Sequence, residues 1–411
     1  MRIKKEVRKI VASVLAFLMV VSLIPVNSLM TKANAASKTT FEGGKTVEDG
    51  TWKGWTWNVF GSSTDVTKAF ATDTGNGGVT LEVTGDKGKI NGSASDQGLN
   101  TFLYELDKSY DFTITAQAKV DTLAANAQAA FGLTIRDNVG AHGNTAKLTA
   151  DKNNFAFVGG YGNQAASGHG NAGYKTTALA HTRLGESPEV GGTYDLAIQK
   201  VGDSVKLYFN GEVAAECSAD DLITDNAMYV GLFAARNAKV TFNNVKLAYT
   251  QDSSSVKVTT NVTAPKKTTY CAGNTYEDVD LTGFKATVSV DGKEREITAS
   301  DCVVDMSNDP FAEVTDAGKL NLLYLGQTIE VPITVIKEVV SDMYIEYMPV
   351  KTDYMVTDTA LDFTGLVGKV VYNSGRTFDL KTLIDSNDTN TKVSDVDFTT
   401  AGNKEVTVSH T

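Results

Sequence analysis

Apolar and polar residues alternate along this chain in short runs, most clearly near residue 115. Between Tyr110 and Val120, apolar side chains take every second position from Phe112 onward, and Thr, Gln and Lys fill the positions between them. Successive side chains of a β-strand point to opposite faces of its sheet. The period of two therefore predicts a strand with one buried face and one polar face.

Similar runs recur up to residue 250, and long helical periodicity is absent. The other runs that predict strands are Val79–Thr84, Ala130–Arg136, Asn154–Gly159, Tyr194–Lys200, Ser204–Asn210, Met228–Ala235 and Lys239–Tyr249. Asn210-Gly211 is a hairpin signal, because both residues tolerate positive φ. Many short strands separated by Gly-rich loops predict an all-β fold, with one large jelly-roll β-sandwich over residues 40–250.

A short motif occurs twice in the C-terminal part of the chain. Pro265–Tyr270 and Pro349–Tyr354 both read P-x-K-T-x-Y. A D-x-T-G sequence follows each of them, at Asp280–Gly283 and at Asp362–Gly365. Self-similarity at a nearly constant spacing predicts two copies of one structural unit.

The two copies are expected to be small β domains that follow the sandwich. We expect a polar linker at 251–255, the first copy at 256–337 and the second at 340–411. Their size and strand-like runs fit small immunoglobulin-like (Ig-like) β-sandwiches. The run Thr328–Val335 at the end of the first copy has no counterpart in the second. The second copy is therefore expected to be truncated, with an open sheet edge, and the chain to be a fragment of a longer protein.

The first 35 residues have the composition of a secretory signal peptide. Basic residues precede an apolar stretch from Ile10 to Pro25, and Ala33-Asn34-Ala35 reads as a small-residue cleavage site. We expect residues 1–35 to be removed and the protein to be secreted, with an extracellular or cell-surface location. The alternative is an uncleaved membrane anchor, although the apolar stretch is short for a membrane span.

Charge narrows the range of partners. The chain carries 49 Asp and Glu against 38 Lys and Arg, a formal net charge of −11. Nucleic acid and anionic lipid would both be repelled, so neither is an expected partner. An acidic polymer such as pectate would need local basic groups or bridging cations.

Three cysteines, Cys217, Cys271 and Cys302, are too few for a secreted disulfide scaffold. Cys271 and Cys302 lie within one repeat and could pair, but the second copy has no counterparts. Cys217 would then remain a buried free thiol. No C-x-x-C occurs and the histidine spacing fits no metal motif, so no cofactor is expected. Loop oxygens could still hold a structural calcium, for which no ligand set can be named.

The two copies resemble the bacterial Ig-like domains of Gram-positive surface and secreted proteins. The residues that carry the resemblance are PKKTTY, DLTGFKATVSVDG and TDAGKLNLLYLG in the first copy, and PVKTDY, DFTGLVGKVVYNSG and TTAGNKEVTVS in the second. The resemblance implies spacer or stalk modules, some of which bind partners.

Residues 40–250 resemble the concanavalin A-like jelly-roll accessory domains of secreted polysaccharide-active proteins, such as the pectate-lyase-type enzymes of Gram-positive bacteria. The resemblance rests on GWTWNVFGSST (54–64), GVTLEV with the GKING that follows it (78–92), FGLTIRDNVG (131–140), YDLAIQKVGDSVKLYFNGE (194–212) and MYVGLFAARNAKVTFNNVKL (228–247). It implies glycan binding, or stabilisation of a neighbouring catalytic domain. The favoured partner is a plant or microbial polysaccharide, pectin-like in the first instance.

A tryptophan cluster is the first candidate for a carbohydrate-binding site. Trp52, Trp55 and Trp57 fall within six residues, and indole rings stack on the apolar faces of sugars. The alternative is that Trp55 and Trp57, which share a strand face with Val59, belong to the core. We expect Trp52 at the surface.

Two further groups of residues could contact a glycan. Arg136 and Asp137 end an apolar strand and would either line the concave face of the sandwich or form a salt bridge at its rim. Tyr161, Asn163 and Tyr174 lie in a long, polar, Gly-rich region, where binding residues often concentrate. The alternative for that region is a solvated loop.

Signatures of catalysis are missing. Jelly-roll glucanases use an E-x-D-x-x-E strand, because one carboxyl group protonates the leaving group while another attacks. Glu105-Leu106-Asp107 supplies E-x-D, but Tyr110 takes the third position. The sequence therefore predicts a secreted, non-catalytic carbohydrate-binding region with spacer modules. The alternatives are the N-terminal part of a larger pectate lyase or other polysaccharide-degrading enzyme, and a cell-surface adhesin.

Overall fold

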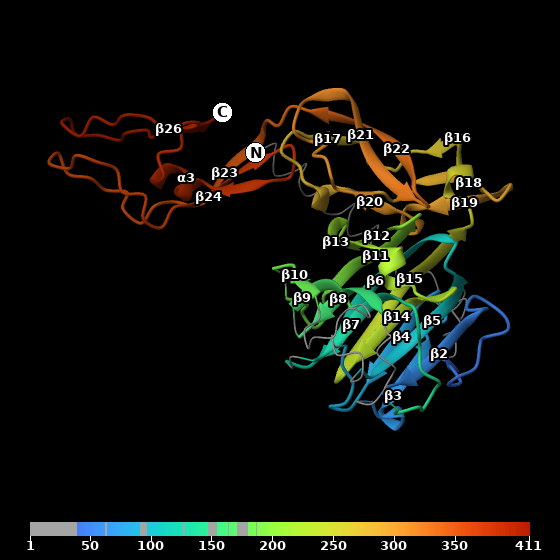
Figure 1. Ribbon diagram of the computed structural model, residues 1–411. Helices are drawn as coiled ribbons and strands as arrows, with labels where there is room; N and C mark the ends of the chain where they lie inside the picture. Colours follow the sequence, from blue (N-terminus) through green and yellow to red (C-terminus); the bar gives the residue numbers. More distant parts are fainter. Residues whose placement is uncertain are drawn as a thin grey trace, which may run out of the picture.

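The computed structural model describes residues 39–61, 64–90, 97–125, 128–146, 154–162, 164–170, 180–185 and 187–411. The predicted leader, residues 1–35, lies outside them. The described strands fall into three groups in sequence order: a large sandwich up to Thr250, a first module with strands from Lys257 to Ile336, and a second module with strands from Val340 to His410 (Figure 1). Strands dominate all three units, so the predicted all-β class is confirmed.

Two antiparallel sheets build the sandwich. The eight-stranded sheet has the order β1-β3-β4-β15-β6-β11-β12-β13, with bounds β1 Thr39–Thr40, β3 Ala69–Asp73, β4 Val79–Val83, β15 Ala238–Thr250, β6 Asp111–Leu123, β11 Thr193–Val201, β12 Ser204–Phe209 and β13 Glu212–Ser218. The seven-stranded sheet has the order β10-β9-β8-β7-β14-β5-β2, with bounds β10 Ala180–Arg183, β9 Gln164–Gly170, β8 Phe155–Tyr161, β7 Ala130–Arg136, β14 Ala227–Ala235, β5 Leu99–Asp107 and β2 Trp55–Phe60. Both sheets draw neighbouring strands from distant parts of the chain, as in a jelly roll.

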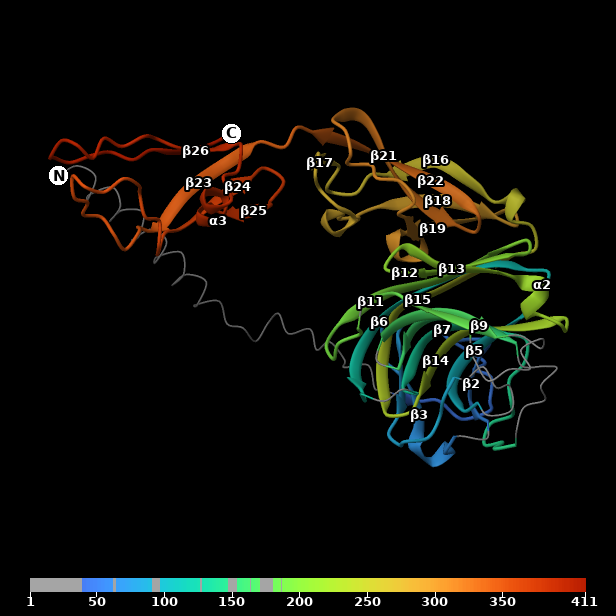
Figure 2. The ribbon, with the colours of Figure 1, turned by 60° about the vertical axis from the view of Figure 1, so that its left-hand side comes forward.

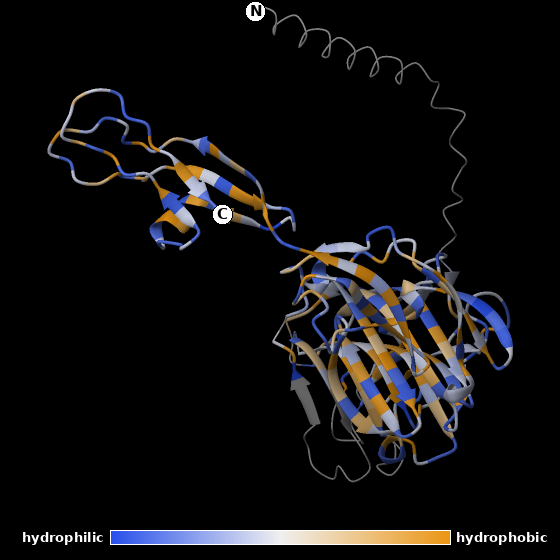
Figure 3. Ribbon diagram, turned by 90° about the horizontal axis from the view of Figure 1, so that it is seen from above, coloured by the Kyte–Doolittle hydropathy of each residue, from blue (hydrophilic) through white to orange (hydrophobic). Residues whose placement is uncertain are grey.

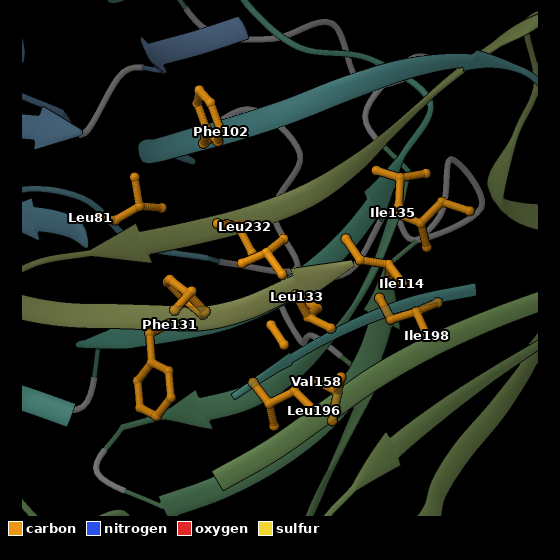
Figure 4. Close-up of a cluster of buried hydrophobic side chains, with 14 of the residues drawn as sticks. Leu81, Phe102, Ile114, Phe131, Leu133, Ile135, Val158, Leu196, Ile198 and Leu232 are labelled. Carbon is orange, nitrogen blue, oxygen red and sulfur yellow. The ribbon is translucent and has the colours of Figure 1, made fainter. Parts of the chain in front are cut away.

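The core lies between these two sheets and is built by the alternation seen in the sequence. On β6, Phe112, Ile114 and every second residue up to Val120 point into it. Leu133 and Ile135 of β7 and Leu232 of β14 face them from the opposite sheet (Figure 4). The striped hydropathy of the strands in Figure 3 reflects the same period of two.

Strands with strong alternation are predicted closely, and short or polar strands are missed. β7 begins and ends at the predicted residues, β4 and β12 deviate by one residue at one end, and β11 extends by one residue at each end. The runs named in the sequence do not include β1, β3, β5, β9, β10 and β13. Of these strands, β1, β10 and β13 lie at sheet edges, and β9 lies next to the edge strand β10.

The first module is a smaller sandwich with its own core. A three-stranded sheet of β16 (Lys257–Thr263), β18 (Lys285–Val290) and β19 (Lys293–Thr298) faces a four-stranded sheet. The four-stranded sheet has the order β17-β22-β21-β20, with bounds β17 Thr269–Cys271, β22 Gln327–Ile336, β21 Thr315–Tyr324 and β20 Val303–Asp305. Ile329, Val331, Ile333 and Val335 of β22 are all in the core.

The second module has no such closed core. Its strands are β23 (Val340–Tyr347), β24 (Val367–Tyr372), β25 (Thr377–Asp379), β26 (Thr391–Val393) and β27 (Val408–His410), with one helix, α3 (Leu380–Asp385). Within residues 340–411, all of which are described, no strand takes the place that β22 has in the first module. Leu366, Val370 and Leu380 are the apolar side chains buried there, while many others are exposed.

The repeated motif forms the same local clamp in both modules. In the first, the Tyr270 hydroxyl accepts a hydrogen bond from the Asp280 backbone amide at 3.3 Å. The Asp280 carboxylate accepts one from the Thr282 amide at 2.8 Å, and the Lys267 ammonium lies 4.6 Å from the centroid of the Tyr270 ring. The tyrosine, aspartate and lysine of the motif therefore hold two chain segments together.

In the second module, the equivalent tyrosine and lysine make the same contacts. The Tyr354 hydroxyl accepts a hydrogen bond from the Asp362 amide at 2.9 Å, and the Lys351 ammonium lies 4.5 Å from the Tyr354 ring centroid. Asp362 likewise accepts a hydrogen bond from the Thr364 amide at 2.8 Å. The sequence repeat is thus a repeat of local structure.

The first module docks on the polar face of β6, β11 and β12 (Figure 2). Thr113 of β6 accepts a hydrogen bond from the Leu325 amide at 3.1 Å, and Thr115 donates one to the Ser300 carbonyl oxygen at 2.6 Å. Ala197 and Tyr208 of the sandwich pack against Val303 of the module. The part of the predicted polar face that holds Thr113 and Thr115 is therefore covered by protein.

All three cysteines carry free thiols. The Cys271–Cys302 bridge, one of the two alternatives from the sequence, is not formed. Cys217 is partly exposed, so the expectation that it is buried is wrong. In the described part of the chain, no helix is both long and apolar enough to cross a membrane.

We predict that Thr113→Val weakens the sandwich–module contact. Its hydroxyl accepts from both the Leu325 amide and the Gln199 side chain, and valine has the same shape without an acceptor. Leaving these buried donors unpaired should lower the free energy of unfolding by about 1–3 kcal/mol, measurable by urea denaturation. Thr122→Val, at an exposed position of β6, is the control. Equal effects of the two substitutions would contradict the prediction.

Candidate functional site

The structure places the three tryptophans in the core of the sandwich. Trp52, Trp55 and Trp57 are 4%, 6% and 7% exposed. The Trp55 ring stacks on Phe102 at a centroid distance of 5.2 Å, and Trp52 meets Phe102 edge-on at 5.5 Å. The expectation that Trp52 lies at the surface is wrong, because its ring packs against Trp55 and Phe102. The burial favours the core interpretation for all three.

One tryptophan also takes part in a polar contact inside this core. The Trp57 indole N–H donates to the Asn100 side-chain oxygen at 2.7 Å. The Asn100 amide in turn donates to the carbonyl oxygens of Phe70 and Glu82, which belong to the opposite sheet. This buried asparagine therefore ties the two sheets together. The Trp52 indole nitrogen is buried and has no hydrogen-bond partner among the described residues.

Arg136 and Asp137 are buried at the end of β7, with 0% and 3% of their surfaces exposed. The Arg136 guanidinium donates to the Gln97 side-chain oxygen at 2.8 Å and lies 5.1 Å from the centroid of the Phe155 ring. Burial lowers the pKa of Arg136 to about 10, against the opposing effect of the Asp137 carboxylate, so the guanidinium stays charged at neutral pH. Neither residue lies at an exposed rim.

Asp137 is held by hydrogen bonds from two neighbours. Its carboxylate accepts from the Asn154 amide at 2.8 Å and from the Thr224 hydroxyl at 3.2 Å. Burial raises the pKa of Asp137 to about 6, and these hydrogen bonds and the Arg136 charge offset only part of that effect. A carboxyl group with such a pKa changes its charge near neutral pH.

Tyr161 lies at the other end of the β7–β8 pair. It is 8% exposed, and its register partner is Ala130, whereas Arg136 pairs with Phe155. Six residues of strand separate the two ends, roughly 20 Å. Asn163 and Tyr174 lie outside the described residues. The structure therefore does not bring the predicted tryptophans, Arg136, Asp137 and Tyr161 together into one exposed site.

A different concave surface lies where the first module meets the sandwich. It is a cleft of about 940 Å³. One wall belongs to β6, β11, β12 and β13, and the other to η6 (Tyr276–Asp278), η7 (Ala299–Asp301) and the β20 segment. Ligand sites in proteins are often found at such junctions between domains.

The cleft combines acidic, amide and apolar groups. Its carboxylates are Asp195, Glu212 and Glu277, and no Lys or Arg is among its lining residues. Asn210 and Gln117 line it with Asp195, which accepts from the Gln117 amide at 3.2 Å. The apolar part includes Leu184, Val213, Val304 and Met306.

The cleft cannot be predicted from the sequence because its two walls are far apart in the chain. On the sandwich wall, the alternation of β6 predicts only a polar outer face. The only available signal for the opposite wall was the repeat, which says nothing about where a module docks.

Metal binding finds no support in the geometry. Among the described residues, no group of three or more His, Cys, Asp or Glu side chains is arranged to hold a metal ion. The structural calcium considered from the sequence remains a prediction.

Comparison with known proteins gives one relative by sequence. No family model matches the chain. It is 29% identical over 327 residues to "Pectate lyase L" of Thermoclostridium stercorarium. The match covers 78% of this chain but 24% of that protein, so this chain spans about a quarter of the relative's length.

Similar solved structures share little sequence with this chain. The carbohydrate-binding module CBM66 from Bacillus subtilis covers 50% of this chain and 98% of its own, at 17% identity and a TM-score of 0.29. Lectin II from Ulex europaeus covers 51% and 98%, at 10% identity and a TM-score of 0.31. At these TM-scores the fold assignment rests on the sheet order of the sandwich itself.

We predict that Trp57→Phe destabilises the chain more than Trp52→Phe. Both substitutions remove part of a buried ring, but only the first also leaves the buried Asn100 oxygen without its donor. The difference in the free energy of unfolding should be about 1–3 kcal/mol. Urea denaturation of the two variants measures it, and a larger loss for Trp52→Phe would contradict the assigned contacts.

We also predict that Asp137 makes stability depend on pH. Because its folded-state pKa is raised to about 6, its stabilising contribution is full below the unfolded pKa, about 4, and is lost as pH rises through 6. As the pH rises from about 4 to 6, the melting temperature of the wild type should fall relative to that of Asp137→Asn, in which residue 137 does not titrate. Asp316→Asn, at an exposed carboxylate, should leave the profile in place. An unchanged profile in Asp137→Asn would contradict the assignment.

Proposed function

We propose that this chain is a carbohydrate-binding accessory region of a secreted, polysaccharide-active protein. In this proposal the sandwich binds glycan without covalent change, and the two modules, of bacterial Ig-like type, serve as spacers. The observation that carries it is the similarity to Pectate lyase L, together with a fold whose sheets present a large, rigid surface. The signal-peptide composition of residues 1–35 supports secretion.

The extent of the similarity supports a shared domain arrangement. The 327 matched residues are more than the sandwich alone contains, so the match extends into the modules. A sandwich and modules that recur together in a pectate lyase are suited to holding or positioning a polysaccharide. This supports a plant or microbial polysaccharide as partner and, through the relative's name, pectin as one polymer to test.

A second candidate is that the chain is the N-terminal part of a larger pectate lyase or related enzyme. The observation that favours it is that the chain matches only 24% of Pectate lyase L. In that case catalysis would belong to other parts of the whole protein, and this chain would still contribute binding. A cell-surface adhesin remains the alternative from another class.

Affinity electrophoresis of the full chain on pectin, xylan, β-glucan and fructan tests the binding proposal. We expect slower migration on at least one polymer, because a glycan held by the immobile gel retards the protein. Migration equal to that of a non-binding reference protein on all four polymers would overturn the proposal.

Two further measurements separate the alternatives. The appearance of unsaturated, ultraviolet-absorbing products from pectate incubated with the isolated chain would contradict the non-catalytic role. A protein partner captured from a surface extract, and not released by soluble sugar, would favour the adhesin.

A further inference from the structure

The cleft between the sandwich and the first module has fixed walls. The Thr115 hydroxyl donates to the Ser300 carbonyl oxygen at 2.6 Å, and Leu325 and Thr113 are joined at 3.1 Å. At the other side of the contact, the Thr250 hydroxyl donates to the Asp291 carboxylate at 2.6 Å. These buried and part-buried hydrogen bonds hold the two units in one arrangement, so the cleft is formed before any ligand arrives.

Three hydrogen-bonding side chains along this cleft are left available to a ligand. The side chains of Glu212, Glu277 and Asn244 line it, and none of them has a hydrogen bond to another described residue. Glu212 and Glu277 are exposed and come from opposite walls. Ionised carboxylates accept hydrogen bonds and cannot donate them. The cleft therefore offers acceptors for a ligand rich in donors.

Apolar side chains lie among these acceptors. Val213, next to Glu212, is 51% exposed, and Val304 and Met306 lie on the module wall. A pyranose ring presents hydroxyl donors around its edge and C–H groups on its faces. Such a ligand matches both kinds of surface at once.

The negative charge of the cleft favours uncharged saccharides over acidic ones. The cleft is lined by three carboxylates and by no Lys or Arg, in a chain with a net charge of −11. A polyuronate carries one carboxylate per residue and would be repelled, most strongly at low salt, where screening is weakest. Methyl esterification removes that charge and leaves the ring unchanged.

We propose that this cleft is the glycan-binding site of the chain and that it takes an uncharged saccharide, methyl-esterified pectin included, in preference to a polyuronate. The inference rests on the proposed carbohydrate-binding function and deepens it. Glu212 and Glu277 accept hydroxyl hydrogen bonds from the two walls, and the apolar side chains between them contact the ring faces.

The test compares glycans that differ in charge. Wild-type chain is run on xylan, β-glucan, highly methyl-esterified pectin and fully de-esterified polygalacturonate, all with EDTA to remove bridging cations. We expect retardation on at least one uncharged polymer, and none on polygalacturonate. The double variant Glu212→Ala/Glu277→Ala should bind the uncharged polymer at least about tenfold more weakly.

A matched control removes two carboxylates outside the cleft. Asp220 lies on the sandwich and Glu294 on the first module, both exposed, so Asp220→Ala/Glu294→Ala makes the same change in net charge. It should bind like wild type. Because all four positions are exposed, circular dichroism and thermal melting should show a folded protein in each case.

A charge-reversed variant adds a gain of function. Glu212→Lys/Glu277→Lys should acquire retardation on polygalacturonate, since the repelling groups become attracting ones.

Each outcome decides between the proposals. No retardation of the wild type on any polymer sinks the carbohydrate-binding function. Retardation that the Glu212→Ala/Glu277→Ala variant retains in full leaves that function standing and overturns the cleft as its site. Wild-type retardation on polygalacturonate in EDTA that this variant loses keeps the cleft and overturns the uncharged ligand.

Discussion

The arrangement of this protein depends on two threonine hydroxyls on the outer face of one strand. Thr113 and Thr115 of β6 receive the first module through Leu325 and Ser300. Their neighbours on the inner face, Phe112 and Ile114, belong to the core of the sandwich. One strand therefore joins two units: its apolar side holds the sandwich together, and its polar side positions the module. Without that contact the cleft between them would have one wall.

The sequence predicts features that depend on residues close together in the chain, and it misses contacts between distant segments. A strand such as β7 is read correctly because all its inward residues are apolar and a period of two needs no knowledge of its partners. The same pattern cannot say what covers the other face. Thr113 and Thr115 look like solvent-facing residues of an amphipathic strand, and only the fold reveals that another unit uses them. The candidate cleft could not be predicted for this reason. Neither of its walls, taken alone, has a sequence pattern that indicates a binding site.

The burial of the three tryptophans explains why they are core residues and not a glycan-binding surface. Trp55 and Trp57 alternate with polar residues, so the core interpretation was available from their strand. Trp52 stands before that strand begins, where no periodicity applies, and its position under Phe102 follows from the path of the chain.

The repeated motif, in contrast, has a structure that its sequence determines locally. The Tyr270 and Tyr354 clamps recur because their partners are close in sequence. They form alike whether the module around them is closed, as in the first, or open, as in the second.

A cleft whose walls belong to two units links binding to docking. Any ligand that contacts both walls binds the docked arrangement and not the separated one, so it stabilises docking by an amount that grows with ligand concentration. By reciprocity, whatever tightens the Thr113–Leu325 and Thr115–Ser300 contacts raises affinity, since less binding free energy goes into ordering the walls. The Thr113 and Thr115 hydroxyls already hold this arrangement in the free protein through their hydrogen bonds to the first module. The cleft is therefore pre-organised, and a weakly binding sugar unit loses little of its interaction energy to conformational change.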